Sequence, residues 1–313
     1  MSTRYLITGG AGFIGSALVR ELLKSGEERV AVVDNMLSGK PANLDEVKDQ
    51  VNVHVTDIRD YDAIRPLFDG IDTVFHLAAI PSVPRSIKDP VPSHDVNCNG
   101  KFNVYRAAKE AGVRRVIYAA SSSAYGDTLV LPKVETMAPK PKSPYALQKL
   151  LGEYYGSVFH CCYGLETVSL RFFNVFGPRQ DPGSPYSGVL SLFMKAALEK
   201  TAPTIFGDGE QTRDFTYVED VAALVHKAAH APGVSGSVYN AGNGNRHSLN
   251  FLWSEVQKLA GVSIPAKYGP PREGDVRDSQ ADTTAARRDL GHDPKFPIEE
   301  GLRRTFEWYK ASC

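Results

Sequence analysis

The start of the chain constrains the fold most, because a strand, a glycine-rich turn and a helix follow one another without a gap. Residues 5–8 form a short apolar run that is typical of a buried strand. The turn over 9–15 reads Gly-Gly-Ala-Gly-Phe-Ile-Gly. Leucines and alanines then recur at helical spacing over 17–23. This order is that of the first unit of a dinucleotide-binding α/β sheet.

The glycines of this turn have separate expected tasks. Gly9 permits a tight turn, Gly12 lets the backbone approach a pyrophosphate, and Gly15 lets the helix pack close to the strand. The positive end of the helix would then face the phosphates. The next predicted strand, 30–33, runs into Asp34, where a carboxylate can accept hydrogen bonds from an adenosine ribose. Because that carboxylate would repel a 2′-phosphate, the sequence predicts NAD rather than NADP.

The ends of two later predicted strands add residues to the expected cofactor-binding surface. The predicted strand 51–55 leads to Asp57, and the predicted strand 73–77 leads to Ala78 and Ala79. Cofactors bind outside the carboxyl ends of strands in open parallel sheets. We therefore expect Asp57 near the adenine amino group, and Leu77, Ala78 and Ala79 near the middle of the cofactor. Asp57 could equally be the N-cap of a helix over 60–68.

Alternation of strand and helix patterns continues to about residue 173 and predicts a doubly wound parallel α/β sheet. Beyond it, helical patterns cover 189–198, 217–230, 283–290 and 298–309, and 203–216 is loop-like with one short strand. We expect a dinucleotide-binding domain over 1–173, to which parts of about 212–248 return. A smaller, partly interleaved substrate-binding domain would comprise about 174–211 and 249–313.

The composition of the chain limits the kinds of molecule that it is expected to bind. The formal net charge is +0, and no Lys/Arg block stands out, so nothing favours nucleic acid or a membrane surface. The chain shows no signal peptide and no apolar run of the roughly 20 residues that cross a bilayer, and we expect a cytoplasmic protein. The four cysteines, Cys98, Cys161, Cys162 and Cys313, lack metal-ligand spacing, and no metal is expected.

Residues 143–149 (Ser-Pro-Tyr-Ala-Leu-Gln-Lys) carry the candidate for proton transfer. Ser143 suits an N-cap and Pro144 the first position of a helix, so Tyr145 and Lys149 would share one helix face. An ammonium at this spacing and the positive helix end both favour phenolate. We therefore expect the pKa of Tyr145 to lie below its ordinary value of about 10.

With these features in place, the chain resembles the extended short-chain dehydrogenase/reductase family. Within that family it is similar to nucleotide-sugar 4-epimerases, above all those acting on UDP-N-acetylglucosamine and UDP-glucose. The segments that carry the narrower resemblance are 120–126 (Ala-Ser-Ser-Ser-Ala-Tyr-Gly), 143–149, 171–180 (Arg-Phe-Phe-Asn-Val-Phe-Gly-Pro-Arg-Gln), 213–215 (Arg-Asp-Phe) and 274–282 (Gly-Asp-Val-Arg-Asp-Ser-Gln-Ala-Asp). The resemblance implies a Rossmann fold.

It also implies a mechanism. Tyr145 takes the proton of the sugar 4-hydroxyl while hydride passes from C4 to NAD, and Lys149 holds the cofactor ribose. The same hydride then returns to the opposite face of a bound 4-keto sugar and inverts C4. Ser121 would relay the proton, although Ser122 or Ser123 could substitute, and at least one of the three would cap the strand end. Dehydratases and decarboxylases of this family have an acidic residue here, and this sequence has none.

The resemblance assigns further contacts residue by residue. For the cofactor these are Phe13, Ile14, Asn35, Ser38, Gly39, Ile58, Asn97, Ala120 and Phe173. For the UDP-sugar they are Ser82, Arg85, Ser121, Ser122, Ser123, Tyr145, Asn174, Val189, Phe206, Arg213, Arg272, Asp275 and Ser279. Among them, Asn174, Arg213 and Arg272 would hold the diphosphate and Phe206 would pack on uracil. Ser279 is small and would admit an N-acetylated sugar as well as a plain hexose.

Three alternatives stay open. The chain could epimerise another nucleotide sugar such as UDP-glucuronate, it could be a 4,6-dehydratase, or it could be a non-catalytic NAD-binding scaffold or sensor. The intact Tyr145 and Lys149 count against the last, since a binding module has no need of a polarised phenol. The resemblance also implies a homodimer formed through helices around 99–111 and 144–163.

Overall fold

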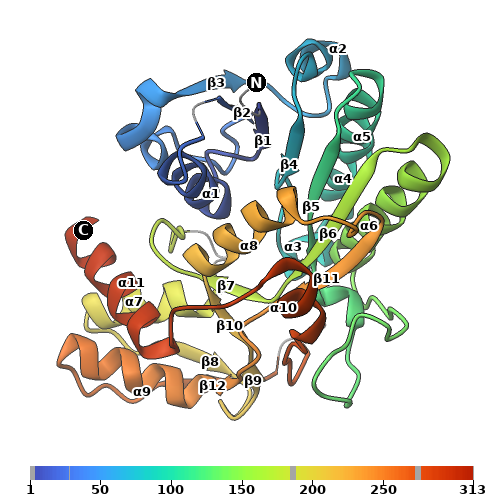
Figure 1. Cartoon of the computed structure of the whole chain (residues 1–313). Helices are drawn as coiled ribbons and strands as arrows, with labels where there is room; N and C mark the ends of the chain where they lie inside the picture. The colour runs from blue at the N-terminus through green and yellow to red at the C-terminus, as the bar shows by residue number, and fades with distance from the viewer. Residues whose placement is uncertain (1–3, 28, 184–187, 272–275, 313) are drawn as a thin grey trace.

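A seven-stranded sheet, in which all neighbouring strands run parallel, forms the centre of the molecule (Figure 1). The structure is a computed structural model and describes residues 4–27, 29–183, 188–271 and 276–312. The strand order is β11-β6-β5-β4-β1-β2-β3. The strands are β1 (Tyr5–Thr8), β2 (Val30–Asp34), β3 (Val51–Val55), β4 (Thr73–His76), β5 (Arg115–Ser121), β6 (Glu166–Phe172) and β11 (Ser237–Ala241). The predicted doubly wound parallel sheet is confirmed, and its strand order reverses between β1 and β4, where such sheets bind ligands.

Helices cover both faces of this sheet. On one face, α1 (Phe13–Lys24) packs beside α8 (Val218–His230) over apolar residues of β1, β2, β5 and β6. On the other face, α5 (Lys101–Glu110) packs beside α6 (Pro144–Tyr163). Short helices complete the connections: α2 (Tyr61–Ile64), α3 (Val83–Lys88), α4 (Pro90–His94) and α10 (Thr284–Leu290). Successive residues of β1 face the two different helical layers, which is why the strand is apolar throughout.

A second group of elements lies below the sheet in Figure 1 and has its own apolar core. Its helices are α7 (Val189–Leu198), α9 (Leu249–Ala260) and α11 (Ile298–Ser312). Its strands pair two by two: β7 (Asn174–Phe176) with β10 (Phe215–Tyr217), β9 (Thr212–Arg213) with β12 (His247–Ser248), and β8 (Thr204–Phe206) with β13 (Lys267–Gly269).

The expectation of one short strand over 203–216 is therefore wrong, since that segment contributes β8, β9 and most of β10. Two-residue and three-residue strands carry too little alternation to be detected from the sequence. The chain leaves the sheet after β6, builds part of the second group, and returns with α8 and β11. The exact division into two domains stays a prediction.

Helix α6 begins as its sequence predicts. The hydroxyl of Ser143 accepts a hydrogen bond from the backbone N–H of Ala146 (3.1 Å), and Pro144 occupies the first turn. The helix ends at Gly164, whose φ of 70° suits a residue without a side chain. Between these ends, Glu153 on α6 accepts two hydrogen bonds from Arg171 on β6 (2.9 and 2.7 Å). This buried ion pair joins the helix to the sheet.

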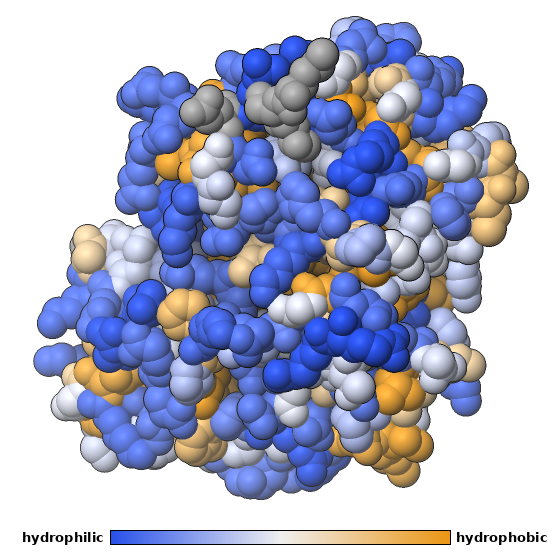
Figure 2. Space-filling view, viewed as in Figure 1, coloured by the Kyte–Doolittle hydropathy of each residue, from blue (hydrophilic) through white to orange (hydrophobic). Residues whose placement is uncertain are grey.

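The face drawn in Figure 2 is covered mostly by hydrophilic side chains, with hydrophobic ones in small groups. Within the described residues, none of the helices combines the length and the apolar composition needed to cross a membrane.

We predict that Arg171→Met lowers the free energy of unfolding by about 3–5 kcal/mol, because it leaves the Glu153 carboxylate buried without its partner. The double variant Arg171→Met/Glu153→Leu should recover most of this loss, since neither charge is then buried. Urea unfolding followed by circular dichroism measures both. Equal losses in the single and double variants would contradict the prediction.

Candidate active site

The glycine turn lies against the end of β4 and is closely packed. Gly9 has a φ of +77°, and a Cβ there would lie 2.7 Å from the backbone nitrogen of Ala78. A Cβ on Gly15 would lie 2.1 Å from the carbonyl oxygen of Gly9. The expected tight turn at Gly9 is therefore confirmed, and at Gly15 the start of the helix packs closely on the glycine turn that follows β1. Gly12 stands at the start of α1, where no side chain caps the helix, so the approach of a phosphate to Gly12 stays a prediction.

Asp34 ends β2 and is almost fully buried. Its two carboxylate oxygens accept hydrogen bonds from the backbone N–H groups of Ala11 (3.0 Å) and Met36 (2.9 Å). Burial raises the pKa of Asp34, and these two bonds oppose that rise. A Cβ on Gly39 would lie 2.7 Å from this carboxylate, so Gly39 lets the segment after β2 fold over Asp34. The carboxylate is thus held beside the glycine turn, as predicted from the glycines of 9–15 and the acidic residue at the end of the next strand.

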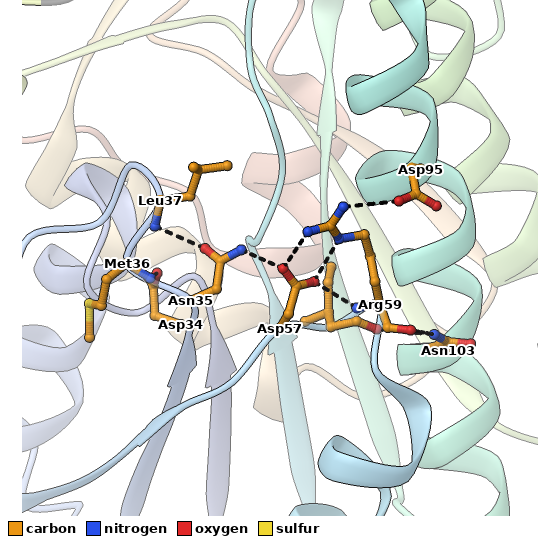
Figure 3. A network of polar contacts seen from close by, with 9 residues as sticks. Asp34, Asn35, Met36, Leu37, Asp57, Arg59, Asp95 and Asn103 are labelled. Atoms are coloured by element: carbon orange, nitrogen blue, oxygen red, sulfur yellow. Dashed lines mark hydrogen bonds and ion pairs between the residues drawn. The ribbon is translucent and has the colours of Figure 1, made fainter.

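Asp57 belongs to a network of polar contacts (Figure 3). Its carboxylate accepts hydrogen bonds from Asn35 Nδ2 (2.7 Å), Arg59 Nε (3.0 Å) and Arg59 Nη2 (2.9 Å). Arg59 also bonds Asp95 on the far side (3.0 Å). The bonds from Arg59 hold the pKa of Asp57 at about 2.

The alternative role of Asp57 as a helix N-cap is wrong, because the side chain of Asp60 accepts the capping bond from Ala63 N (3.1 Å). Arg59, which lies two residues from Asp57, is not among the residues predicted from the sequence. A contact of Asp57 with adenine stays a prediction, and so do the contacts of Asn35, Ser38 and Ile58.

Asn97 fixes the segment that follows β4. Its side chain accepts from Ile80 N (2.8 Å) and donates to Ile80 O (3.0 Å) and to Gln148 Oε1 (3.0 Å). Leu77 N bonds Thr8 O (3.0 Å), so residues 77–80 are held between β1 and the start of α6. The structure thus gives Asn97 a positioning role, whatever it contacts in a bound cofactor.

Tyr145 stands at the start of α6 and faces the end of β5. Its phenol is hydrogen-bonded to Ser121, the last residue of β5. The Ser121 hydroxyl also accepts hydrogen bonds from the backbone N–H (3.2 Å) and hydroxyl (2.9 Å) of Ser123. Ser121 is therefore both the strand-end cap and the serine next to the phenol, while Ser123 supports it.

The expected pKa of Tyr145 is wrong in direction for the protein alone. Burial raises the pKa of Tyr145 to about 12, and the bond with Ser121 only partly opposes this. Burial also lowers the pKa of Lys149 to about 8, although Glu153 acts in the opposite direction. The neighbouring charge and the helix end can be identified in the sequence, whereas the cost of burying a charge depends on the folded chain. Lys149 still carries its proton at neutral pH, one turn from the phenol.

A layer of buried polar side chains, not predicted from the sequence, lies next to Lys149. The ring of Tyr118 has the ammonium groups of Lys149 and Lys101 at 5.1 and 4.9 Å from its centroid. Burial, with the charge of Lys149, lowers the pKa of Lys101 to about 7. His76 stacks on the same ring (centroids 5.7 Å) and bonds Thr8 Oγ1 (2.7 Å). No isolated pattern marks these residues, because they come from four different elements.

Two of the three expected catalytic residues, Ser121 and Tyr145, open into one cavity of about 240 Å³, whereas the buried Lys149 does not line it. Ser121 and Tyr145 lie on its wall with Asn174, Arg213 and Ser279, so the strand end, α6 and the second group meet there. The other residues that line it are Val83, Ser122, Ser123, Tyr125, Gly126, Lys133, Lys142, Ser143, Ala146, Phe172, Phe173 and Val276. None of these described lining residues is acidic.

Asp214 holds the second group's side of this cavity in place. It is fully buried and accepts hydrogen bonds from the backbone N–H groups of Asn243 (2.8 Å), Gly244 (2.9 Å) and Ala281 (3.0 Å). Its carbonyl oxygen accepts from both the backbone and the side chain of Asn174 (3.0 Å each). Burial raises the pKa of Asp214 to about 6, which these N–H groups oppose. Asp214 thus connects the segments that bear Asn174, Arg213 and Ser279.

Other expected substrate contacts lie away from this wall. Ser82 caps α3 by accepting from Arg85 N (3.1 Å), and neither residue lines the cavity, although Val83 between them does. Val189 starts α7 and Phe206 ends β8, both half-buried. Arg272 and Asp275 lie outside the described residues. A larger hollow of about 380 Å³ beside Phe215, Arg246 and His247 contains none of the expected catalytic residues.

Known proteins with this arrangement are numerous. Residues 5–242 match the model of the NAD dependent epimerase/dehydratase family. UDP-glucose 4-epimerase of Mycolicibacterium smegmatis is 38% identical over 311 residues, which are 98% of each chain. The structure of UDP-glucose 4-epimerase from Thermotoga maritima with UDP-glucose has a TM-score of 0.94 at 37% identity and covers 99% of both chains.

A UDP-N-acetylglucosamine 4-epimerase is equally similar. The enzyme of Methanobrevibacter ruminantium, solved in complex with UDP-N-acetylmuramic acid, has a TM-score of 0.95 at 36% identity. The match covers 100% of this chain and 99% of that one.

We predict that Lys149→Met removes a pH dependence of stability in the NAD-free protein. Between pH 8 and 10.5 the unfolded chain binds a proton at Lys149 and the folded chain does not, so the free energy of unfolding rises with pH. The rise between pH 7.5 and 9.5 should be smaller by about 2 kcal/mol in the variant. Urea unfolding across this range measures it, with the exposed-lysine variant Lys24→Met as control. An unchanged slope in Lys149→Met would contradict the prediction.

Proposed function

The chain belongs to the NAD dependent epimerase/dehydratase family, and from this premise we propose that it is a 4-epimerase of UDP-hexoses. The observation that carries the proposal is the cavity in which Ser121 and Tyr145 face Asn174, Arg213 and Ser279. A proton-transfer pair and a set of polar groups suited to a nucleotide sugar thus share one space. We further propose that the sheet and its helices hold the cofactor and that the second group holds the UDP-sugar.

NAD is the cofactor of this family, and the residues present fit it. At Gly9 and Gly15 a Cβ would clash with the neighbouring backbone, so the turn provides a smooth surface at the start of α1. Asp34 is held beside that turn and suits a ribose without a 2′-phosphate. When bound, NAD supplies the hydride acceptor and donor together with one further positive charge.

The residues of the chain move the proton. Tyr145 accepts it from the sugar 4-hydroxyl and returns it after inversion, and Ser121 relays it through the hydrogen bond that the two share. The ammonium of Lys149 stabilises the phenolate from one turn away. Since burial, only partly opposed by the bond with Ser121, raises the pKa of Tyr145 to about 12, the phenol becomes a base only when further positive charge lies close to it.

The polarity of the cavity favours epimerisation over elimination. A dehydratase must move a proton at C5 and expel a leaving group, which calls for an acidic side chain near the serine. The described part of the cavity wall offers Lys133, Lys142 and Arg213 and no carboxylate. Of these, Arg213 suits the diphosphate of a UDP-sugar, because the ammonium of Lys133 is buried on Thr128 O and Lys142 is paired with Asp127 (3.3 Å).

Ser279 supports acceptance of N-acetylated sugars. It is small, it lines the cavity, and its buried hydroxyl has no hydrogen-bond partner among the described residues. A buried hydroxyl without a partner is costly, and a bound sugar can satisfy it. We therefore propose that UDP-GlcNAc and UDP-GalNAc are substrates as well as UDP-glucose and UDP-galactose.

We predict that the purified protein with NAD converts UDP-GlcNAc and UDP-glucose to their 4-epimers, resolved by anion-exchange chromatography and proton NMR. Tyr145→Phe should lower kcat by about 10²–10⁴-fold, because the proton acceptor is lost, and still bind NAD. Tyr163→Phe makes the same change at the far end of α6 and should leave turnover unchanged.

Other reaction products would support one of the three alternative functions. Conversion of UDP-glucuronate alone would indicate an epimerase of that sugar, and a 4-keto-6-deoxy product would indicate a dehydratase. If the protein binds NAD but converts none of these sugars, it is a non-catalytic NAD-binding scaffold or sensor. A fully active Tyr145→Phe would contradict the assigned role of the phenol.

We also propose that two copies pair through α5 and α6. The outer face of α6 carries Leu147, Tyr154 and Val158, which are 50–58% exposed and recur at helical spacing. Phe102 on α5 is 39% exposed and lies beside Tyr155 (ring centroids 5.6 Å). A contiguous apolar face on two neighbouring helices is suited to an isologous dimer.

Sedimentation equilibrium should give twice the chain mass of 34.2 kDa. Val158→Glu should shift the protein toward the monomer, because it places a charge in the apolar face. Leu129→Glu, on an exposed loop that belongs to neither helix, should not. A monomeric wild-type chain would refute the proposal.

A further inference from the structure

A cluster of metal-ligating side chains lies near the amino end of the sheet, away from the cavity. His226 and His230 stand four residues apart on α8, and Glu27 lies in the connection between α1 and β2. One ligand atom of each residue lies within 4.8 Å of the others. We propose that these three residues bind a divalent transition metal ion, with zinc the best match to two imidazoles and a carboxylate.

The fold brings the ligands together. Residues four apart on a helix share a face, and the two imidazole rings have their centroids 5.2 Å apart. Helices α1 and α8 pack side by side on the sheet (Figure 1), so the chain leaving α1 passes the end of α8. The carboxylate of Glu27 is thereby added to the histidine pair from about 200 residues away in the sequence.

Polar groups around the ligands are arranged as a metal site needs. The hydroxyl of Tyr5, at the buried start of β1, lies 3.1 Å from Glu27 Oε1 and 3.1 Å from His230 Nε2. On the other side, Nδ1 of His226 has Ser25 Oγ at 3.5 Å and Glu21 Oε1 at 4.0 Å. Hydrogen-bond partners of this kind orient ligating imidazoles and carboxylates.

The exposure of the cluster decides what an ion would do there. His230 is exposed while Glu27 and His226 are half-buried, so an ion can enter and keep water at its remaining positions. None of the three residues lines the catalytic cavity. The ion would tie the connection between α1 and β2 to the end of α8, and its effect is on stability rather than on turnover.

The test is titration of the NAD-loaded protein with zinc chloride, by calorimetry and by thermal unfolding. It uses Cys161→Ser/Cys162→Ser as the background, because these exposed thiols would bind zinc themselves. We expect one zinc ion per chain and a rise in Tm of a few degrees at saturation. Glu27→Gln keeps an acceptor for Tyr5 and should weaken zinc binding by roughly tenfold or more, as should His230→Gln.

His94→Gln changes an exposed histidine on α4 and should bind zinc as the background does. Magnesium should give no rise in Tm, because a site of two imidazoles does not favour a hard ion. Absence of the zinc-dependent rise, or equal zinc affinity in the background and in His230→Gln, would overturn the proposal. Glu27→Gln is excluded as a probe if it is less stable than the background variant in EDTA. In that case the visible absorption spectrum of the cobalt-loaded Cys161→Ser/Cys162→Ser variant decides whether the site binds a metal. Absence of absorption bands from bound cobalt would then contradict the proposal.

Discussion

The position of helix α6 governs the site, and buried polar contacts with the sheet fix that position. Arg171 on β6 binds Glu153 with two hydrogen bonds, and the hydroxyl of Tyr118 on β5 donates to the carbonyl oxygen of Lys149 (3.1 Å). These contacts are directional, so they set the rotation of the helix as well as its distance from the sheet. With that rotation fixed, Lys149 points into the interior and Tyr145 meets the end of β5.

Buried polar contacts also fix the second group of elements, which holds α7, α9 and α11. Asp214 collects three backbone N–H groups from segments after β11 and before α10, and its own carbonyl oxygen fixes Asn174. A single buried carboxylate thus holds together stretches of chain that would otherwise be independent loops. The polar wall of the cavity is built on backbone contacts, which depend little on the side chains that face the substrate.

Much of the sheet half could be predicted, because its signals are local. A glycine turn after a strand, Asp34 at the next strand end and Ser143-Pro144 before a helix each depend on neighbours in the sequence. The short strands β7 to β10 could not, since they exist only through pairing with distant partners. The pKa of Tyr145 was predicted in the wrong direction for the same reason. Tyr145 is half-buried where the start of α6 meets β5, and no helix pattern contains that contact. Histidines four apart on α8 were visible in the sequence, but Glu27 and Tyr5 join them only in the folded chain.

The return of the chain to the sheet has a consequence for synthesis. Strand β11 pairs with β6, yet residues 173–236 lie between them. At about 5–20 residues per second, a ribosome exposes β6 for several seconds before its partner emerges. During that time the sheet has an open, apolar edge of the kind that invites pairing with another nascent chain. Yield in a cell therefore depends on how quickly residues 237–241 follow, or on a chaperone that covers β6 until they do.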